Sequence, residues 1–245
     1  MSSLFLSPST QTGNLYVSGG SEQFWMNRLA DVMEPYLWAA GINVTRNNPD
    51  GTALTAIRQS NLGHYDFHLA LHSNAAPEEA PGTIRYSVTY YFPGSANGMR
   101  MANIITDNLR ELYPLPDLVY TEANGSIGEL RRTRAPAALV ELAFHDNEED
   151  AEWITENLEP IAANLSLSVT EYFGLPFLEP EAPRPGVVKL SSGTLNLRGA
   201  PLLDAPVLRA IPNGADVEIL GEYGDWCSVQ YLGTFGWVHR NYLEF

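Results

Sequence analysis

The sequence predicts an α/β protein with a mostly parallel sheet flanked by helices, followed by a small all-β barrel. Up to residue 174, short apolar runs alternate with longer segments of helical period, which is typical of strands joined by helices. Residues 175–188 are rich in proline and have no hydrophobic period, as in a semi-rigid spacer. From residue 189 onward, short strand-like runs are separated by turn signals. We therefore expect one domain at 1–174, a linker at 175–188 and a second domain at 189–245.

The first domain begins with alternating strands and helices. In chain order the expected elements are a strand at Leu4–Leu6, a helix at Glu22–Ala39, a strand at Asn43–Arg46, a helix at Ala53–Asn61 and a strand at Phe67–His72. Apolar residues recur along one side of the first helix, and Gly41 follows it where a glycine often ends a helix. Strands joined by helices in this way usually lie parallel.

The second half of this domain continues the pattern. The expected elements are a strand at Ile84–Phe92, a helix at Ala96–Leu112, a strand at Ala137–Phe144 and a helix at Glu148–Phe173. The first of these strands is rich in tyrosine, so we expect it at an edge of the sheet. After the linker, turn signals separate the short strands of the barrel, at Gly193, Asn213–Gly214, Tyr223–Gly224 and Gly233.

Charge and composition narrow the range of partners. The chain has 29 acidic and 14 basic side chains and a formal net charge of −15, which repels nucleic acid and anionic lipid alike. The sequence contains no run of about 18 apolar residues, so it predicts no insertion into a membrane. The N-terminal residues lack the pattern of a secretion signal. The single cysteine, Cys227, excludes an internal disulfide. Oligomeric state and export route stay open.

Polar side chains are expected at one edge of the predicted sheet. Glu141 interrupts the apolar run AALVELAF, where a buried charge requires a partner or a functional reason. Pairing with Arg131, Arg132 or Arg134 is the structural alternative. His72 ends the run DFHLALHSNA, and His145 follows Glu141 by four residues. Both histidines lie at the carboxyl ends of strands, where open α/β sheets bind ligands, and alternation places His145 on the same face as Glu141.

Two further side chains belong to this region of the sequence. Glu22 begins the first long helix after the loop TGNLYVSGGS, so its carboxylate can reach the same edge of the sheet. The alternative is that Glu22 has no functional role and, as a first-turn glutamate, only interacts with the helix dipole. His68 shares a face with His72 but lies about 13 Å from it along the strand, and we expect a structural role for it.

These segments, taken together, resemble a known family. The order of Glu22 after a strand and loop, then LALHSNA, then PAALVELAFHDNEEDAEWI, is similar to the zinc-dependent N-acetylmuramoyl-L-alanine amidases of the amidase-3 type, over about residues 4–173. The resemblance implies that Glu22 and His72 match two zinc ligands and that Glu141 matches the catalytic glutamate. The family's first ligand is a histidine in a DPGHGG-like loop. Here the loop reads LSPSTQTGN, with Thr10 or Gln11 near its place.

The missing histidine leads to a hypothesis about the metal site. A catalytic zinc normally has three protein ligands and an open position for water. We hypothesise that His145 supplies the third ligand, so that Glu22, His72 and His145 hold one zinc ion. By resemblance, zinc would activate a water molecule, while Glu141 would take its proton and deliver one to the leaving L-alanine nitrogen. The bond cleaved would join N-acetylmuramic acid to the stem peptide.

The C-terminal segment resembles a second family. Residues 190–245 contain LSSGTLNLRGAP, LRAIPNGADVEIL and DWCSVQYLGTFGWVHRNYL, which are similar to the opening, central turn and ending of the bacterial SH3 domain. Such domains commonly help cell-wall hydrolases to hold peptidoglycan, so peptidoglycan is the expected partner and the bacterial cell wall the expected place of action. Aromatic side chains for this binding could come from Tyr223, Trp226, Tyr231, Phe235, Trp237 or Tyr242.

Two other functions stay open from the sequence. The missing histidine is compatible with a catalytically inactive cell-wall-binding protein on an amidase fold. The same ligands could also serve a zinc peptidase that acts on the stem peptide, because they can activate water against any amide. The sequence does not separate a phage lysin from a sporulation enzyme or an autolysin.

Overall fold

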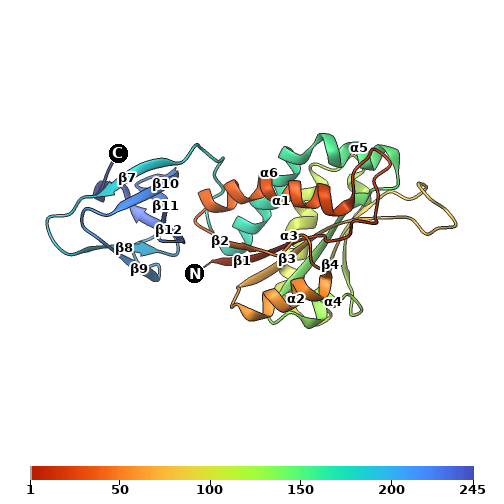
Figure 1. The fold of residues 1–245 in the computed structure, drawn as a ribbon, viewed down its shortest axis with the longest axis horizontal. Coiled ribbons are helices and arrows are strands. Elements are labelled where there is room, and N and C mark those ends of the chain that lie inside the picture. Colours follow the sequence, from red (N-terminus) through yellow and green to blue (C-terminus); the bar gives the residue numbers. More distant parts are fainter. Residues whose placement is uncertain (1) are drawn as a thin grey trace.

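The computed structural model describes residues 2–245, which form two domains with a separate sheet each. The first domain consists of β1 (Ser3–Pro8), α1 (Glu22–Ala39), β2 (Asn43–Arg46), α2 (Ala53–Leu62), β3 (Phe67–Asn74), β4 (Ser87–Tyr91), α3 (Ala96–Arg110), the 3-10 helix η1 (Pro116–Leu118), β5 (Val119–Ala123), α4 (Gly128–Arg132), β6 (Ala137–Phe144), α5 (Glu148–Glu156) and α6 (Leu158–Phe173). The second consists of β7 (Arg184–Val188), β8 (Thr194–Arg198), β9 (Val207–Pro212), β10 (Asp216–Tyr223), β11 (Trp226–Tyr231), β12 (Thr234–His239), η2 (Arg240–Tyr242) and β13 (Leu243–Glu244). Figure 1 shows the two domains at opposite ends of an elongated molecule.

The predicted fold class is confirmed. The first sheet has six strands in the order β2-β1-β3-β6-β4-β5, and β2, β1, β3 and β6 run parallel. The second sheet has seven strands in the order β13-β7-β10-β11-β12-β8-β9 and is antiparallel where its strands pair. Within residues 2–245, no helix is long and apolar enough to cross a membrane.

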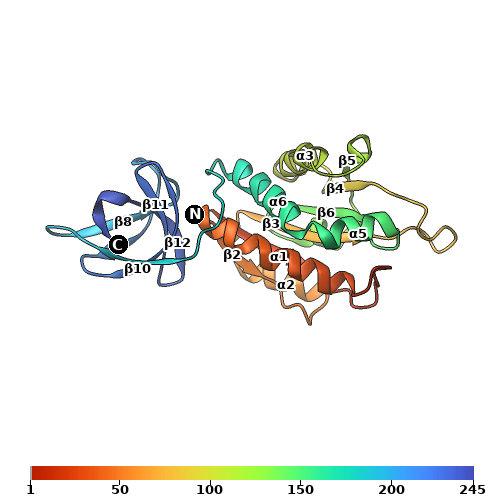
Figure 2. The ribbon, with the colours of Figure 1, turned by 90° about the horizontal axis from the view of Figure 1, so that it is seen from above.

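Helices cover both faces of the first sheet. Helices α1, α5 and α6 lie on one side, and α2 and α4 lie on the other (Figures 1 and 2). The larger core joins α1, α3, α5 and α6 to alternate residues of the central strands, such as Leu4 and Leu6 of β1 and Leu69 of β3. A smaller cluster around Leu130 and Leu139 packs on the opposite face. Burial of the sheet on both sides explains why its central strands read as continuous apolar runs.

Helix α1 begins after Ser21 and ends before Gly41, the glycine that the sequence indicated as its end. The Ser21 hydroxyl accepts a hydrogen bond from the backbone N–H of Phe24, which caps the first turn and places Glu22 at its start. Gly41 follows the C-terminal residue with φ of 74°, a conformation that glycine adopts without strain. The Ser21 cap therefore places Glu22 at the first turn of the helix, at one edge of the sheet.

Several details of the first domain differ from the prediction. Strand β4 lies within the expected 84–92 segment, but it runs antiparallel to β6 and is not at the edge of the sheet. The unpredicted strand β5 pairs parallel to β4 and forms that edge. The helix expected at 148–173 is divided at Asn157 into α5 and α6. Pro160 explains this break, because a proline in a helix interior clashes with the carbonyl of the residue four positions earlier. Helix α4 was not expected either, and its five residues are too few to show a helical period.

The segment predicted as the linker is packed rather than free along its length. Its last five residues form β7, which pairs with β10. Before that strand, Phe177 stacks on Tyr36 of α1 with ring centroids 5.6 Å apart, and the space around Gly221 is filled by Leu178. These contacts connect the linker to both domains.

The barrel is docked on the C-terminal end of α1 and the start of β2. Trp237 is fully buried, and its Nε1 atom donates a hydrogen bond to the carbonyl oxygen of Ala40 at 3.2 Å. Its ring lies so close to Gly41 that a Cβ atom there would come within 2.6 Å of Nε1. The Asn43 side chain exchanges two hydrogen bonds with the backbone of Phe235, at 3.0 and 3.1 Å. The barrel therefore contacts the end of α1 that lies opposite Glu22, about 27 Å away along an 18-residue helix.

The single cysteine reports on the integrity of the barrel. Cys227 is fully buried in the barrel core, and burial raises the pKa of its thiol to about 11. We expect no reaction of the native protein with an aromatic disulfide reagent at pH 8, and one thiol per chain in denaturant, because the thiolate is the reactive form. Rapid labelling of the native protein at pH 8 would contradict this packing.

Candidate active site

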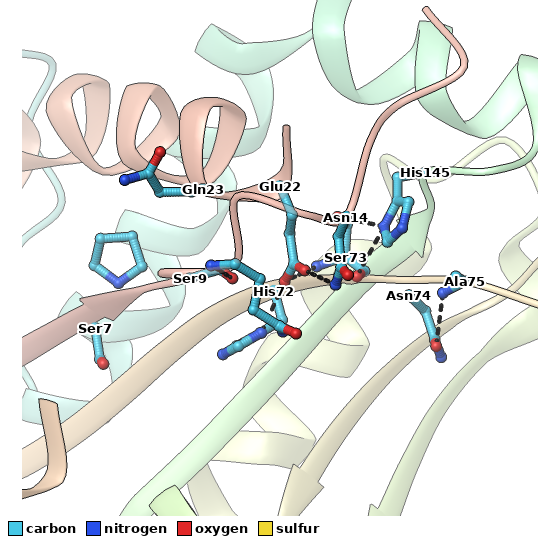
Figure 3. A network of polar contacts seen from close by, with 12 residues as sticks. Ser7, Ser9, Asn14, Glu22, Gln23, His72, Ser73, Asn74, Ala75 and His145 are labelled. Carbon is cyan, nitrogen blue, oxygen red and sulfur yellow. Dashed lines mark hydrogen bonds and ion pairs between the residues drawn. The ribbon is translucent and has the colours of Figure 1, made fainter. Parts of the chain in front are cut away.

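The candidate site lies where the carboxyl ends of β1, β3 and β6 meet the start of α1. His72 of β3 and Glu141 of β6 are direct partners in the register of these parallel strands. Glu22 approaches His72 from α1, as Figure 3 shows. The structure thus brings together three of the four side chains that the sequence indicated.

Glu22 and His72 are in direct contact. The Glu22 side chain is fully buried, and its Oε1 atom lies 2.8 Å from Nδ1 of His72. The backbone N–H of Ser73 also donates to Oε1 at 3.3 Å, and the Asn14 side chain donates to Oε2 at 2.6 Å. Burial raises the pKa of Glu22, but the hydrogen bond and charge of His72 outweigh this and lower it below its usual range. Glu22 is therefore an ionised carboxylate with a fixed orientation. A first-turn glutamate that interacts only with the helix dipole would not be held by these partners.

Glu141 has a carboxylate oxygen without a protein partner. Its Oε2 atom is buried and accepts no hydrogen bond from the described residues. Burial raises the pKa of Glu141 to about 7, with Glu22 adding to the rise and His72 opposing it. Arg134, one of the possible ion-pair partners, instead donates to the carbonyl oxygen of Asn61 at 3.2 Å. A buried acceptor with a pKa near neutrality is typical of a functional carboxyl group.

His145 lies beside Ser73. Its Nδ1 atom is 3.1 Å from both the hydroxyl and the carbonyl oxygen of Ser73, and its ring stacks on Tyr16 with centroids 5.3 Å apart. Figure 3 shows the ring directed at Ser73. Because a carbonyl oxygen only accepts, the contact with it places a hydrogen on Nδ1.

An irregularity in strand pairing accounts for the position of His145. His72 pairs with Glu141, but Asn74 pairs with Phe144, so two steps along β3 correspond to three along β6. One extra residue in a strand reverses the faces of the side chains that follow. The simple alternation that placed His145 on the face of Glu141 is therefore interrupted, and the role of His145 as a metal ligand stays a prediction.

The structure adds one residue that sequence reasoning missed. Glu129 of α4 is buried, and its carboxylate lies 3.3 Å from Nε2 of His72 and 3.1 Å from Nε2 of His68. His68 is fully buried and also contacts the Ser60 hydroxyl at 3.0 Å, in agreement with its expected structural role. The acidic residue in SIGELRR was the available signal, but nothing local connects it to β3.

A cavity reaches His72 and Glu129. It measures about 380 Å³ and is lined by the loop after β1, the start of α2, His72 and Glu129. Thr10 and Gln11 form part of this wall, so the loop that lacks the family's histidine still borders the site. The unprotonated form of Glu141, the register partner of His72, can accept a proton from a water molecule.

The described side chains only partly fit a zinc ion. Glu22 and His72 offer an oxygen and a nitrogen ligand side by side, and the unpartnered oxygen of Glu141 lies in the same region. Within residues 2–245, however, no group of three or more histidine, cysteine, aspartate or glutamate side chains has the geometry to hold a metal ion. A catalytic zinc normally has three protein ligands, so the arrangement does not by itself complete such a site.

Solved structures with a similar fold include two N-acetylmuramoyl-L-alanine amidases and an endolysin catalytic domain. N-acetylmuramoyl-L-alanine amidase AmiC2 of Nostoc punctiforme has a TM-score of 0.61 and 14% identity, over 70% of this chain and 97% of that one. The catalytic domain of the amidase CwlV from Bacillus (Paenibacillus) polymyxa var. colistinus has a TM-score of 0.60 and 16% identity, over 72% and 100%. The catalytic domain of the CD27L endolysin, which targets Clostridia difficile, has 0.57 and 19%, over 70% and 98%. No curated protein sequence matches the chain.

Family models match both domains. The model described as N-acetylmuramoyl-L-alanine amidase matches residues 9–170, which is more than half of the chain. The model described as bacterial SH3 domain matches residues 193–244, the strands of the barrel after β7. These matches agree with the resemblance of both segments. The chain belongs to the N-acetylmuramoyl-L-alanine amidase family and carries a C-terminal bacterial SH3 domain.

Proposed function

We propose that this protein hydrolyses the amide bond between N-acetylmuramic acid and L-alanine in bacterial peptidoglycan. The observation that carries the proposal is the unpartnered Oε2 atom of Glu141, beside His72 and at the edge where Glu22 approaches. A carboxyl group with a pKa of about 7 can accept and donate a proton at neutral pH. The family to which the chain belongs supplies the substrate class.

Glu141 performs the proton transfers of the proposed reaction. In its ionised form it takes a proton from a water molecule as the water oxygen bonds to the lactyl carbonyl carbon. When the carbon–nitrogen bond breaks, the protonated carboxyl group returns that proton to the leaving nitrogen of L-alanine. The immediate products are the carboxylic acid of the muramic acid and a peptide with a free amine. The proton of the acid then passes to the amine, which gives a carboxylate and an ammonium N-terminus, so atoms and charges balance.

Zinc dependence is the finer part of the proposal. Two adjacent ligands, Glu22 and His72, support it, and His145 remains the predicted third ligand. For that role His145 has to offer Nε2 or turn away from Ser73, because its Nδ1 atom contacts the oxygens of Ser73. A zinc ion bound at such a site supplies Lewis-acid activation of the carbonyl and of water.

Zinc content per chain tests the three-ligand hypothesis. After equilibration with zinc and removal of the free ion, we expect about one zinc per wild-type chain and much less in both His72→Ala and His145→Ala. Loss in both variants would follow from a shared ion. Full stoichiometry in His145→Ala beside loss in His72→Ala would contradict a ligand role for His145 and leave it as a partner of Ser73 and Tyr16.

Product analysis distinguishes the proposed function from its alternatives. Isolated peptidoglycan treated with the full chain should release peptides that begin with L-alanine and leave intact glycan strands. New N-termini within the stem peptide would instead indicate a peptidase. Sedimentation of the protein with the wall, without release of any product, would indicate a catalytically inactive wall-binding protein.

The SH3 domain supports action at the cell wall. We propose that exposed aromatic residues on the barrel contact peptidoglycan, and among the six named from the sequence Tyr223 and Tyr242 are exposed. Trp237 is excluded from this role because it is buried against Ala40 and Gly41. Removal of the whole barrel would uncover this apolar contact on α1, so single substitutions such as Tyr242→Ala separate wall binding from stability better than a deletion does.

A further inference from the structure

Glu129 is a buried carboxylate that the proposed reaction leaves without a role. Only 5% of its surface is exposed. Three hydrogen-bond donors surround it: Oε1 lies 2.6 Å from the Ser7 hydroxyl and 3.1 Å from Nε2 of His68, and Oε2 lies 3.3 Å from Nε2 of His72. The carboxylate therefore connects the two histidines of β3.

The charge of Glu129 determines which ring nitrogens carry hydrogen. The Ser7 hydroxyl donates to Oε1 of the carboxylate at 2.6 Å, and the two histidine rings form ion pairs with it through their Nε2 atoms, so both of its oxygens are placed as acceptors. An ionised carboxylate only accepts hydrogen bonds, so Nε2 of each histidine must carry a hydrogen. In His68 this leaves Nδ1 free to accept from the Ser60 hydroxyl at 3.0 Å.

His72 faces Glu22 with its Nδ1 atom. With Nε2–H directed at Glu129, the other ring nitrogen, Nδ1, lies 2.8 Å from Glu22 Oε1. Two bare acceptors at this distance repel each other, so a hydrogen or another cation lies between them. The carboxylate behind the ring thus selects the nitrogen that faces the site, as partner carboxylates do for histidines at many metal and catalytic centres.

We propose that Glu129 is a positioning residue, which keeps a hydrogen on Nε2 of His72 and thereby directs Nδ1 toward Glu22. The inference rests on the proposed function in one respect, because that function places His72 at the site of amide hydrolysis. Glu129 acts through His72 and takes no proton from the substrate.

Glu129→Gln provides the sharpest test because it preserves shape and removes one acceptor. Glutamine has a single oxygen and an NH₂ group. With its oxygen facing the two donors at Ser7 and His68, its NH₂ group faces His72, whose Nε2 atom must then become an acceptor. In the full chain labelled with ¹⁵N-histidine, the Nε2 resonance of His72 should change from a protonated to an unprotonated ring nitrogen, with assignment by His72→Gln.

The kinetic readout and the controls separate positioning from simple structural support. On peptidoglycan, Glu129→Gln should lower kcat at least about tenfold with little change in KM. Glu129→Asp keeps the charge and should retain the protonated Nε2 and part of the turnover. Ser60→Ala removes a partner of His68 alone and should leave the His72 resonance and turnover at wild-type values.

The outcomes distinguish failure of this inference from failure of the proposed function. A protonated Nε2 with wild-type kcat in Glu129→Gln would overturn the positioning role, as would an equal loss in Ser60→Ala. If Glu129→Gln does not fold, an unprotonated Nε2 in Glu129→Asp would overturn it as well. A wild-type protein that releases no peptide, but whose His72 resonance responds as expected, would refute the proposed function and support the positioning role.

Discussion

Replacement of Glu141 by glutamine should reduce amide hydrolysis by about 10²–10⁴-fold, because the variant can no longer take or return a proton. Release of alanine-terminated peptides from peptidoglycan is the measurement. In the wild type, turnover should rise with pH through about 7 as Glu141 ionises and becomes a base. Turnover within a few fold of wild type in Glu141→Gln would contradict the assigned role.

The wild type should lose stability relative to the same variant as the pH rises. Burial raises the folded-state pKa of Glu141 to about 7, so the contribution of its neutral form is complete below about 4.5 and is lost as the pH rises through 7. Glutamine does not titrate. Denaturant unfolding should therefore show Glu141→Gln more stable than wild type by on the order of 1–3 kcal/mol at pH 8, and a smaller difference at pH 5. An unchanged difference across this range would indicate that Glu141 is well solvated.

Trp237→Ala should lower the free energy of unfolding by about 3–5 kcal/mol, as large-to-small substitutions of buried aromatic residues do. The indole is fully buried, donates to Ala40 and packs on Gly41, so its loss opens the contact between the two domains. Denaturant unfolding followed by circular dichroism measures the loss.

A matched aromatic substitution serves as the control for Trp237. Tyr223 belongs to the same barrel but is 52% exposed, so Tyr223→Ala should change stability by less than about 0.5 kcal/mol. If Trp237→Ala were as stable as Tyr223→Ala, the docking of the barrel on α1 would be contradicted.

The candidate site was predictable where one residue conflicts with its local pattern. Glu141 is an acid in an apolar strand, and His72 is a histidine at the carboxyl end of one, so both could be identified before any contact was known. Glu129 could not, because its five-residue helix has no readable period and its partners are 57 and 61 residues away. For His145, the spacing from Glu141 predicted a shared face of the strand. Spacing alone does not reveal the extra residue in the pairing of β6, which interrupts this alternation.

The fold shows a similar division between local and long-range information. Hydrophobic period and the helix ends at Ser21 and Gly41 were sufficient to predict α1. The antiparallel direction of β4 was not predictable, because strand direction depends on the connection and on the neighbours in the sheet rather than on the residues of the strand. The burial of Trp237 also depends on a partner surface far away in sequence, so a domain motif does not reveal it.

The most direct test of the account is treatment of a defined muramoyl–L-alanyl peptide with wild type and Glu141→Gln in parallel, followed by mass spectrometry. We expect wild type to yield free N-acetylmuramic acid and a peptide with an N-terminal L-alanine, while Glu141→Gln leaves the substrate intact. Cleavage at another bond, or equal cleavage by both proteins, would contradict the assignment of this edge of the sheet as a muramoyl-L-alanine amidase site with Glu141 as its acid and base.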